Sequence, residues 1–378
     1  MTVVGTRPEL IKMSLVIRRL DELCDHVLVH TGQNFDHALN GVFFDDLGLR
    51  PPDHFLGVAG HGPAETIARI IGETDKVFAR EQPAAVLIYG DTNSGLCVIP
   101  AKRRKIPVFH MEAGNRCFDQ RVPEELNRKV IDHLSDINMV LTEHARRYLL
   151  AEGLPGDRIF KVGSHMAEVL EEFRPKIEAS PILERLGLTP DAFFLVSAHR
   201  EENVDSESRL RMLIDSLNGL AAEYGFPIVT STHPRTQQRL DASIGRAGEL
   251  SPLVRLLPPF GFTDYIKLQM NAFCVLSDSG TITEESALLD LPAVTMREAH
   301  ERPEGMDAGT LVMSGIGPGE LMEAVRAARA GYRKRRFAGA VPDYEGGEVS
   351  TKVVRIVLSY IDFVNRTVWH KGAGSDAA

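Results

Sequence analysis

Cysteine is scarce in this sequence, and no cysteines are spaced as metal ligands. The four cysteines, Cys24, Cys97, Cys117 and Cys274, are scattered and form no C-x-x-C pair, so we expect no metal site. The first residues also lack the charged and then apolar pattern of a signal peptide. Four cysteines without an export signal are typical of a reduced, cytoplasmic protein.

Two further absences concern basic charge and long apolar runs. Lys and Arg number 43 against 52 Asp and Glu, which gives a formal net charge of −9 at pH 7, so the chain lacks the basic excess typical of nucleic-acid binding. No apolar run approaches the roughly 20 residues of a membrane-spanning helix. We therefore expect neither a nucleic-acid partner nor a membrane partner.

The composition that remains is that of a globular protein. Hydrophobic residues make up 43% of the 378 residues, and another 32 residues are Gly. Together these match globular domains and exclude disordered or collagen-like chains. A chain of this length holds two to three domains, and we expect two.

Short apolar runs alternate with longer amphipathic segments along most of the chain, which predicts parallel sheets covered by helices on both faces. The expected strands form two series: residues 1–4, 26–30, 84–89, 108–110, 139–142 and 159–162, then 193–197, 228–231, 254–257, 273–277 and 293–296. Because eleven strands are many for one open sheet, the predicted class is α/β, with two doubly wound Rossmann-like domains facing a cleft.

The boundary between the domains is expected near residues 168–190. This segment is charged, contains three prolines and shows no strand pattern, which fits either a surface helix or, as we favour, an interdomain connection. We predict an N-terminal Rossmann-like domain over residues 1–166 and a C-terminal one over 167–350. Residues 351–378 are expected to form a last helix followed by a frayed tail.

Ligands of open parallel sheets bind where strands end and loops lead into helices, so these junctions carry the functional predictions. The first junction combines Gly5, Arg7 and a helix start at Pro8, with Lys12 one turn farther on. Amides at a helix start and a nearby guanidinium favour an anion, although an ordinary turn with a surface arginine has the same residues. The junction lacks a Gly-x-Gly-x-x-Gly pattern, so NAD is not indicated.

Three carboxylates lie at the following junctions. Asp91 comes directly after an apolar strand, Glu112 ends another, and Glu124 lies in the first turn of a helix entered at Pro123. Each also has a structural explanation: a helix cap, a buried acid satisfied by Arg116 or amides, and an acid favoured by the helix dipole. Their coincidence favours one site, since neighbouring carboxylates repel and can supply an acid and a base.

The second series of strands ends in similar junctions. His199 and Arg200 follow its first strand, where His199 is either a packing histidine or a candidate acid or anion ligand. Arg302 lies in a charged loop after a later strand. It belongs either to a surface ion-pair network or to a phosphate contact.

A loop of small residues precedes another helix of this half. Ser279, Gly280 and Thr281 offer amides at a helix start, which suits a diphosphate. The spacing from Thr281 to Glu284 is that of a capping box. Glu285, one turn into the helix, could accept hydrogen bonds from ribose hydroxyls.

Several of these motifs occur in an order that resembles one known family. They are Gly5-Thr6-Arg7-Pro8-Glu9, Gly90-Asp91-Thr92, Glu112-Ala113-Gly114, Pro123-Glu124-Glu125-x-Asn127-Arg128, His199-Arg200, Asp278-Ser279-Gly280 and Glu301-Arg302-Pro303-Glu304. From residue 1 to about residue 315 the chain resembles the non-hydrolysing UDP-N-acetylglucosamine 2-epimerase family. The resemblance implies a glycosyltransferase-B-like pair of domains with UDP bound to the second, a site between them, a last helix that returns to the first domain, and a homodimer.

The resemblance also implies an isomerase reaction and residue roles. UDP is eliminated from a UDP-2-acetamido sugar as the C2 proton leaves, and UDP then adds back with the configuration at C2 inverted. No cofactor is required, and the partners are the UDP-sugar and UDP. By family position Asp91, Glu112, Glu124 and His199 are catalytic. The residues that match substrate or UDP contacts are Arg7, Lys12, Arg128, Tyr265 (near the uracil), Ser279, Gly280, Thr281, Glu285 and Arg302.

Two segments depart from the pattern of many members. Residues 33–36 replace a Gln-His-Arg segment that carries allosteric contacts in bacterial members, which argues against such activation here. Residues 112–121 resemble the UDP-N-acetyl-L-fucosamine synthase branch, which acts on UDP-2-acetamido-2,6-dideoxy-L-talose. A 6-deoxy sugar lacks a hydroxyl, so its pocket can be more apolar, and Phe35 and Phe118 are candidates to line it.

The predicted reaction is therefore the conversion of UDP-2-acetamido-2,6-dideoxy-L-talose to UDP-N-acetyl-L-fucosamine. The alternative substrate pair is UDP-N-acetylglucosamine and UDP-N-acetylmannosamine. A UDP-sugar-dependent glycosyltransferase is the alternative from another class, because the fold does not separate the two. The three carboxylates favour proton chemistry at the sugar ring.

Overall fold

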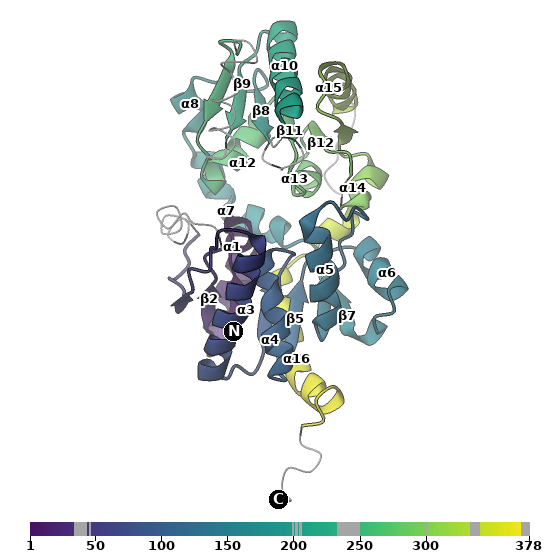
Figure 1. The fold of residues 1–378 in the computed structure, drawn as a ribbon. Helices are drawn as coiled ribbons and strands as arrows, with labels where there is room; N and C mark the ends of the chain where they lie inside the picture. Colours follow the sequence, from purple (N-terminus) through teal and green to yellow (C-terminus); the bar gives the residue numbers. More distant parts are fainter. Residues whose placement is uncertain are drawn as a thin grey trace, which may run out of the picture. The chain divides into compact units, whose positions relative to one another are not determined.

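The computed structural model describes residues 1–33, 44, 47–198, 200, 203, 206–232, 250–299, 301–332 and 341–371. The chain divides into two compact units: unit 1 is Met1–Val169 with Asp343–Ala378, and unit 2 is Leu170–Pro342. Each unit contains one sheet of parallel strands (Figure 1). The predicted class of two doubly wound α/β domains is confirmed. That the domains face a common cleft stays a prediction.

The described part of unit 1 is built on a seven-stranded sheet of order β3-β2-β1-β4-β5-β6-β7. Its strands are β1 (Thr2–Val4), β2 (Leu28–His30), β3 (His54–Phe55), β4 (Val86–Tyr89), β5 (Val108–Met111), β6 (Ile137–Val140) and β7 (Ile159–Lys161). Helices cover both faces, so β1, β4 and β5 are buried at every position. This double burial explains their continuous apolar runs.

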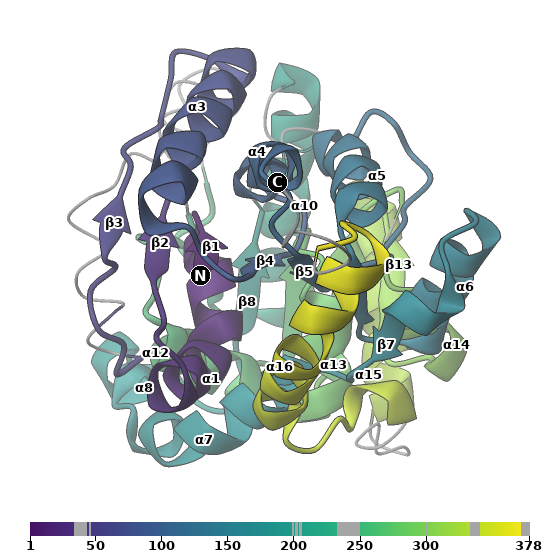
Figure 2. The same ribbon diagram turned by 90° about the horizontal axis from the view of Figure 1, so that it is seen from below.

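The helices of unit 1 form two layers (Figure 2). One face of the sheet carries α3 (Pro63–Glu81), α4 (Val98–Arg103) and α5 (Pro123–Leu134), with the short 3-10 helix η1 (Asn93–Cys97) before α4. The other face carries α1 (Arg7–Leu23) and α16 (Val349–Thr367), which pack against each other. The remaining elements are α6 (Glu143–Ala151), η2 (Gly156–Arg158) and η3 (Pro342–Tyr344).

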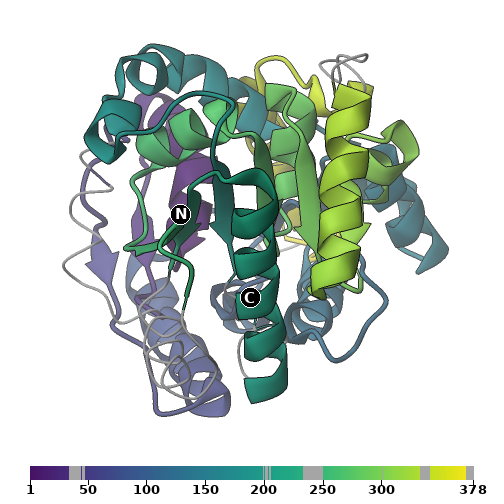
Figure 3. The ribbon, with the colours of Figure 1, turned by 90° about the horizontal axis from the view of Figure 1, so that it is seen from above.

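The described part of unit 2 contains a six-stranded sheet of order β10-β9-β8-β11-β12-β13. Its strands are β8 (Phe194–Ser197), β9 (Ile228–Ser231), β10 (Val254–Leu257), β11 (Cys274–Ser277), β12 (Ala293–Met296) and β13 (Val312–Ser314). Alternate residues of a strand enter opposite cores: Phe194 and Val196 pack with α10 (Glu207–Tyr224) and α15 (Pro318–Tyr332), which lie side by side in Figure 3. Leu195 enters the core formed with α8 (Ile182–Leu186), α12 (Phe262–Asn271) and α13 (Ile282–Leu289). The short helix α14 (Pro303–Ala308) follows β12.

All eleven predicted strands are present in the described residues, and two further strands were not predicted. β3 and β13 are edge strands of two and three residues. Both are shorter than the runs of about four or more residues from which a strand is predicted. The predicted strand 139–142 is also displaced, since β6 spans Ile137–Val140.

The chain passes from unit 1 to unit 2 inside α7 (His165–Ala179) and returns at Asp343. Residues 168–190 thus contain most of α7 and all of α8. After the return, Asp343 accepts hydrogen bonds from the main-chain N–H of Glu143 (2.7 Å) and from Lys161 (2.5 Å). Ser350 donates to Glu168 through its main-chain N–H (2.8 Å) and its hydroxyl (2.5 Å). The last segment is therefore an integral part of unit 1.

Topology brings the predicted junctions to defined positions in each sheet. In unit 1 the strand order reverses between β1 and β4, and in unit 2 between β8 and β11. Such reversal points leave room for ligands beyond the carboxyl ends of the strands. The junctions at Gly5, Asp91 and Asp278 follow these strands. Separately, no helix in the described ranges is long and apolar enough to cross a membrane.

Substitution of Gly163 tests how closely the returning segment packs on unit 1. Its φ is +90°, and an added Cβ would lie 2.5 Å from Cα of Gly346. Gly153 in the same unit has a similar φ of +86° but open space around it. We expect Gly153→Ala to cost about 1–2 kcal/mol through backbone conformation alone. Gly163→Ala should cost several kcal/mol more, as measured by urea unfolding. Equal losses for the two variants would show that the returning segment is not held at this contact.

Candidate functional site

The side chain of Glu9 caps the first main-chain N–H groups at the start of α1. One carboxylate oxygen of Glu9 accepts hydrogen bonds from the main-chain N–H groups of Gly5 (2.5 Å) and Thr6 (2.9 Å), and the other accepts from Thr92 Oγ1 (2.5 Å). Two amides predicted to face an anion are thus taken by this side chain, while Arg7 is the first residue of the helix and half-buried. Burial raises the pKa of the Glu9 carboxyl to about 7, against the opposing effect of these hydrogen bonds.

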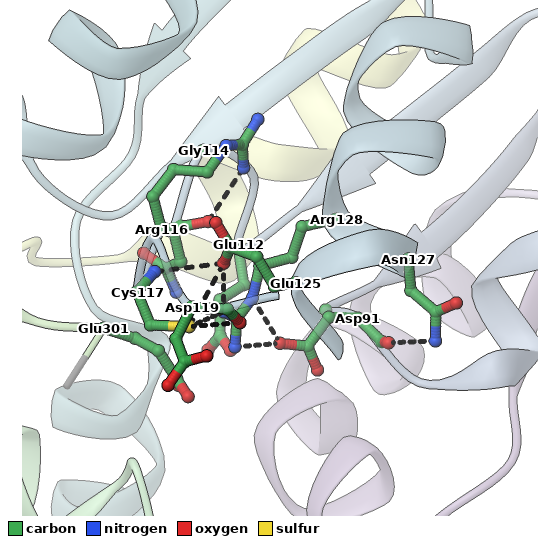
Figure 4. A network of polar contacts seen from close by, with 12 residues as sticks. Asp91, Glu112, Gly114, Arg116, Cys117, Asp119, Glu125, Asn127, Arg128 and Glu301 are labelled. Atoms are coloured by element: carbon green, nitrogen blue, oxygen red, sulfur yellow. Dashed lines mark hydrogen bonds and ion pairs between the residues drawn. The ribbon is translucent and has the colours of Figure 1, made fainter. Parts of the chain in front are cut away.

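Asp91, after β4, is bound by a buried arginine of α5. Arg128 contacts one carboxylate oxygen of Asp91 through Nε (2.8 Å) and Nη2 (2.7 Å). The same guanidinium pairs with Glu125 at 2.9 Å, so it lies between two carboxylates (Figure 4). Burial of Glu125 opposes its ionisation. The main-chain N–H of Cys117 and the guanidinium of Arg128 nevertheless hold the pKa of Glu125 below its ordinary value. Arg128 therefore fixes the position of Asp91 relative to α5.

Glu112, after β5, lies in a different environment. Its backbone has φ +60°, and its side chain is 11% exposed. Lys12 of α1 donates to Glu112 Oε2 at 2.9 Å, and Tyr89, the last residue of β4, donates to the same oxygen. The Tyr89 hydroxyl also contacts His165 Nε2 at 2.5 Å. Lys12, which the resemblance assigns to the substrate, thus pairs with the carboxylate predicted to be catalytic.

Glu124 is the third predicted carboxylate of unit 1. It lies half-buried in the first turn of α5, four residues before Arg128 and so on the same face of the helix. Asp91 and Glu112 therefore lie just after the carboxyl ends of the neighbouring strands β4 and β5, and Glu124 lies at the start of α5.

A buried network supports these two strand ends. Asp132 of α5 accepts hydrogen bonds from the main-chain N–H of Gly114 at 3.2 Å and from Arg116 Nη1 at 2.7 Å. His110 of β5 contacts Asp132 through Nδ1 (2.9 Å) and the carbonyl oxygen of Gly90 through Nε2 (2.7 Å). One carboxylate thus holds the turn after Glu112 directly and, through His110, the turn before Asp91. The structural alternative in which Arg116 satisfies Glu112 is wrong, because Arg116 pairs with Asp132 and Glu152.

In unit 2, Asp278 links the end of β11 to the loop after β8. Its fully buried carboxylate accepts from the main-chain N–H of Arg200 (3.0 Å) and from Asn203 (3.1 Å). Arg200 also pairs with Glu301 (3.2 Å), which in turn pairs with buried Arg297 (2.8 Å). These contacts place a second set of charged groups at the reversal point of the sheet.

Some predicted residues fall outside the described part of the chain. His199 does so, and its catalytic role stays a prediction. Phe35, predicted to line the pocket, also lies outside the described ranges.

The small residues before α13 form a compact turn. Ser279 donates its main-chain N–H to Ser277 Oγ (3.1 Å), and Thr281 donates its own to Ser279 Oγ (3.3 Å). Gly280 lies so close to Glu301 that an added Cβ would be 2.9 Å from the carboxylate. The predicted capping box is wrong, because the Thr281 side chain makes no cap hydrogen bond and contacts the Ser279 hydroxyl at 3.0 Å.

The acidic residues of α13 are buried and engaged. Glu285 accepts a hydrogen bond from Gln269 Nε2 at 2.6 Å, and Glu284 pairs with Arg302 at 3.2 Å. Arg302 is 3% exposed, so it belongs to a buried ion pair. Tyr265 is half-buried, and loss of solvent around its hydroxyl raises its pKa. No group of three His, Cys, Asp or Glu side chains arranged to hold a metal occurs among the described residues.

Comparison with known proteins identifies the family. The family model described as UDP-N-acetylglucosamine 2-epimerase matches residues 18–358. The chain belongs to this family. A structure of a UDP-N-acetylglucosamine 2-epimerase from Rickettsia bellii is 57% identical, with a TM-score of 0.89 over 98% of this chain and 99% of the other. One from Methanocaldococcus jannaschii, in complex with UDP-GlcNAc and UDP, is 30% identical, with a TM-score of 0.86 over 95% and 99%.

Family membership confirms the isomerase class and the glycosyltransferase-B-like fold predicted from the sequence. Within the family the named substrates differ. A UDP-2,3-diacetamido-2,3-dideoxy-D-glucuronate 2-epimerase of Pseudomonas aeruginosa is 34% identical over 359 residues, which are 93% of this chain and 97% of that protein. Membership in the UDP-N-acetylglucosamine 2-epimerase family therefore establishes an epimerase without fixing the sugar.

Sequence reasoning missed three polar residues of the site. Glu9 belongs to the predicted helix-start motif, but its position three residues after Thr6 is that of a capping acid. Tyr89 is predicted only as the last residue of a strand. His165 follows Gly163 and Ser164 at the junction between β7 and α7, which is a strand-to-helix junction like those that carry the functional predictions. The contact of Tyr89 with His165 joins residues 76 positions apart, which no local pattern reveals.

The raised pKa of Glu9 makes the stability of the protein depend on pH. The unfolded chain releases this proton near the ordinary value of 4.5, whereas the folded protein keeps it to about pH 7. The folded state therefore binds more protons between these values, and its stability falls as the pH rises through this range. Glu9→Gln cannot ionise, has nearly the same shape and keeps one acceptor oxygen for the two amides. It removes that loss, so its stability relative to wild type should rise from pH 5 to pH 8 by on the order of 2–3 kcal/mol.

Thermal melting at several pH values measures this difference. Glu73→Gln is the matched control, because the Glu73 side chain is 42% exposed and pairs with Lys76 on the same helix. A difference between Glu9→Gln and wild type that stays constant across the range would contradict the prediction.

Proposed function

We propose that this epimerase inverts C2 of a UDP-2-acetamido sugar by eliminating UDP and adding it back. The C2 proton of such a sugar is not acidic, so its removal must be coupled to departure of the diphosphate. That coupling needs a base at the sugar and groups that stabilise the leaving anion. In this proposal unit 1 supplies the acid–base groups and unit 2 the UDP-binding groups.

The observation that carries the proposal is the set of carboxylates at adjacent strand ends of unit 1. Asp91 is paired with Arg128, whereas Glu112 is held by Lys12 and Tyr89. Two carboxylates at adjacent strand ends, each held by its own partners, suit an acid and a base that act on one carbon. Glu124 is the third acid–base candidate, and which carboxylate takes the C2 proton is left open.

The groups proposed to bind UDP lie around the reversal point of unit 2. The turn of Ser279, Gly280 and Thr281 precedes α13, where the helix dipole favours a diphosphate. The main-chain N–H groups of Ser279 and Thr281 already donate to the Ser277 and Ser279 hydroxyls, so the diphosphate would take their place. Glu285 and Tyr265 lie in α13 and α12 and are proposed to bind ribose and uracil. Arg302 is proposed to act at the same site from the start of α14, although its guanidinium is already paired with Glu284.

The sugar that we propose is UDP-2-acetamido-2,6-dideoxy-L-talose, converted to UDP-N-acetyl-L-fucosamine. Support comes from the sequence of residues 112–121 and from Phe118, whose side chain is 69% exposed and packs edge-on against Tyr148 with ring centroids 5.2 Å apart. An exposed aromatic ring suits a sugar with a methyl group in place of a hydroxymethyl group. The alternative is UDP-N-acetylglucosamine, which the names of the relatives favour. The homodimer and the cytoplasmic location remain parts of this proposal.

Proton NMR in heavy water tests the reaction and the sugar together. We expect the purified protein to replace the C2 proton with deuterium and to produce a second UDP-sugar, because re-addition takes its proton from solvent. Faster exchange with the 6-deoxy-L-talo substrate than with UDP-N-acetylglucosamine would support the proposed branch, and the reverse order would support the alternative. No exchange with either sugar would refute the acid–base proposal for both.

A variant of Glu112 separates chemistry from binding. Glu112→Gln should lower kcat by about 10²- to 10⁴-fold, the usual contribution of an acid–base group, with little change in the affinity for UDP by calorimetry. Glu73→Gln serves again as the exposed control. Wild-type turnover in Glu112→Gln would remove Glu112 from the mechanism.

Gly280 tests the assignment of the UDP site. An added Cβ displaces Glu301 and so disturbs its pairs with Arg200 and Arg297. We expect Gly280→Ala to weaken UDP binding about tenfold, which corresponds to about 1.4 kcal/mol. Gly219→Ala, placed in α10 where the Cβ meets nothing within 4 Å, should bind UDP as wild type does. Unchanged UDP affinity in Gly280→Ala would place the diphosphate elsewhere.

A further inference from the structure

The side chains of Glu112, Tyr89 and His165 form a continuous hydrogen-bonded chain in unit 1. Only Glu112 has a chemical role in the proposed reaction. Tyr89 contacts Glu112 Oε2 and, at 2.5 Å, His165 Nε2. Tyr89 is 4% exposed and His165 is 1% exposed. The three groups come from β4, the end of β5 and the start of α7. Fold packing alone does not require a titratable group at each end of a buried tyrosine.

The tyrosine hydroxyl has one proton, so it donates to only one of its two neighbours at a time. In the first arrangement it donates to the Glu112 carboxylate and accepts from the Nε2–H of His165. In the second, the carboxyl of Glu112 donates to the hydroxyl, which donates to the unprotonated Nε2 of His165. The two arrangements have the same number of protons and differ only in which end of the chain holds one.

Lys12 biases this exchange toward the ionised form of Glu112. Its ammonium group lies 2.9 Å from the same Oε2 atom, and its side chain is 6% exposed. A cation at this distance stabilises a carboxylate. Once Glu112 has taken up a proton, the contact with Lys12 therefore favours release of that proton to the tyrosine hydroxyl.

An epimerase that takes a proton from one face of a carbon and returns one to the other has a protonation problem. After each turnover the base is protonated and the acid is deprotonated, and both must be restored before the same direction can run again. A bound substrate excludes the water that would otherwise carry these protons. A buried side chain that holds the proton while the ligand is bound keeps the base ionised until water returns.

We infer that Tyr89 and His165 form a proton relay that restores the protonation state of Glu112, an inference that rests on the proposed epimerase reaction. The proton on Glu112 Oε2 passes to the Tyr89 oxygen while the proton of Tyr89 passes to His165 Nε2. Glu112 becomes a carboxylate, Tyr89 stays neutral and His165 gains the proton. After the ligand has left, the reverse transfer returns the proton from His165 through Tyr89 to Glu112, whose side chain is 11% exposed, and Glu112 releases it to water. Tyr89 and His165 act through Glu112 and are positioning residues in this role.

Tyr89→Phe removes only the hydroxyl that joins the two ends. We expect kcat to fall at least about tenfold, within the usual range for proton-transfer groups, while KM and the affinity for UDP stay near wild type. Tyr360→Phe is the matched control, because Tyr360 of α16 packs through its ring against Phe160. A wild-type kcat in Tyr89→Phe would overturn the relay.

His165→Ala tests the far end with a readout that a structural role would not give. The substitution leaves a space of imidazole size beside Tyr89, so kcat should fall and added imidazole, at fixed pH and ionic strength, should restore it in a concentration-dependent way. His133→Ala is the control, because His133 is exposed and contacts Glu152. Its activity should be near wild type and insensitive to imidazole. Tyr89→Phe should not respond to imidazole either, since its break lies at the tyrosine.

Two further outcomes keep the test decisive. If His165→Ala does not fold, His165→Gln keeps a hydrogen bond to Tyr89 but cannot take the proton, so its kcat should fall as in Tyr89→Phe. A folded His165→Ala that loses activity without imidazole rescue, or a His165→Gln with wild-type kcat, overturns the relay. C2 exchange by the wild-type protein in heavy water is measured first, since its absence refutes the proposed function, whereas its presence with unaffected variants refutes only the relay.

Discussion

The carboxylate of Asp132 is fully buried in unit 1 and accepts hydrogen bonds from an arginine, a main-chain amide and a histidine ring. A buried charge is tolerated only when its hydrogen-bonding capacity is met, because its removal from water is costly. The carboxylate and its three donors therefore hold one another in place. Gly114 and Arg116 follow Glu112, and His110 of β5 also contacts the carbonyl oxygen of Gly90 before Asp91. Satisfaction of one buried charge thus fixes both turns to α5.

Helix α5 carries this constraint to the candidate site. Arg128 precedes Asp132 by one helical turn and contacts Asp91, while Glu124 precedes Arg128 by another. Residues four apart share a face of a helix, so three functional or supporting side chains are set by one rigid element. Sites held by regular elements keep their geometry better than sites held by loops alone.

The sequence was sufficient to predict the sheets and the positions of the junctions, but not the contacts that give the junctions their chemistry. Central strands such as β4 and β5 are buried on both faces and so had readable apolar runs. The edge strand β3, with two residues, had none. Asp91 and Glu112 were predicted because a carboxylate at a strand end stands out locally. The link from Tyr89 to His165 depends on how β4 and α7 meet in three dimensions, which local patterns do not contain.

The backbone of the segment after β5 is strained, so its conformation does not follow from its sequence motif alone. Glu112 and Phe118 both have positive φ, at +60° and +57°. Such conformations cost on the order of 1–3 kcal/mol each for residues other than glycine. They persist here because Lys12 and Tyr89 hold Glu112, and Glu125 accepts the main-chain N–H of Phe118 at 3.2 Å. The folded surroundings impose the shape of the motif.

The two crossings of the chain between its units have a consequence for biosynthesis. All of unit 2 lies in the sequence between Val169 and Asp343, while unit 1 needs residues on both sides of it. A ribosome therefore completes unit 2 first, and unit 1 must wait with one face of its sheet lacking α16. Because α1 packs on that helix, the face of α1 that α16 covers has no partner there until the last helix has been made.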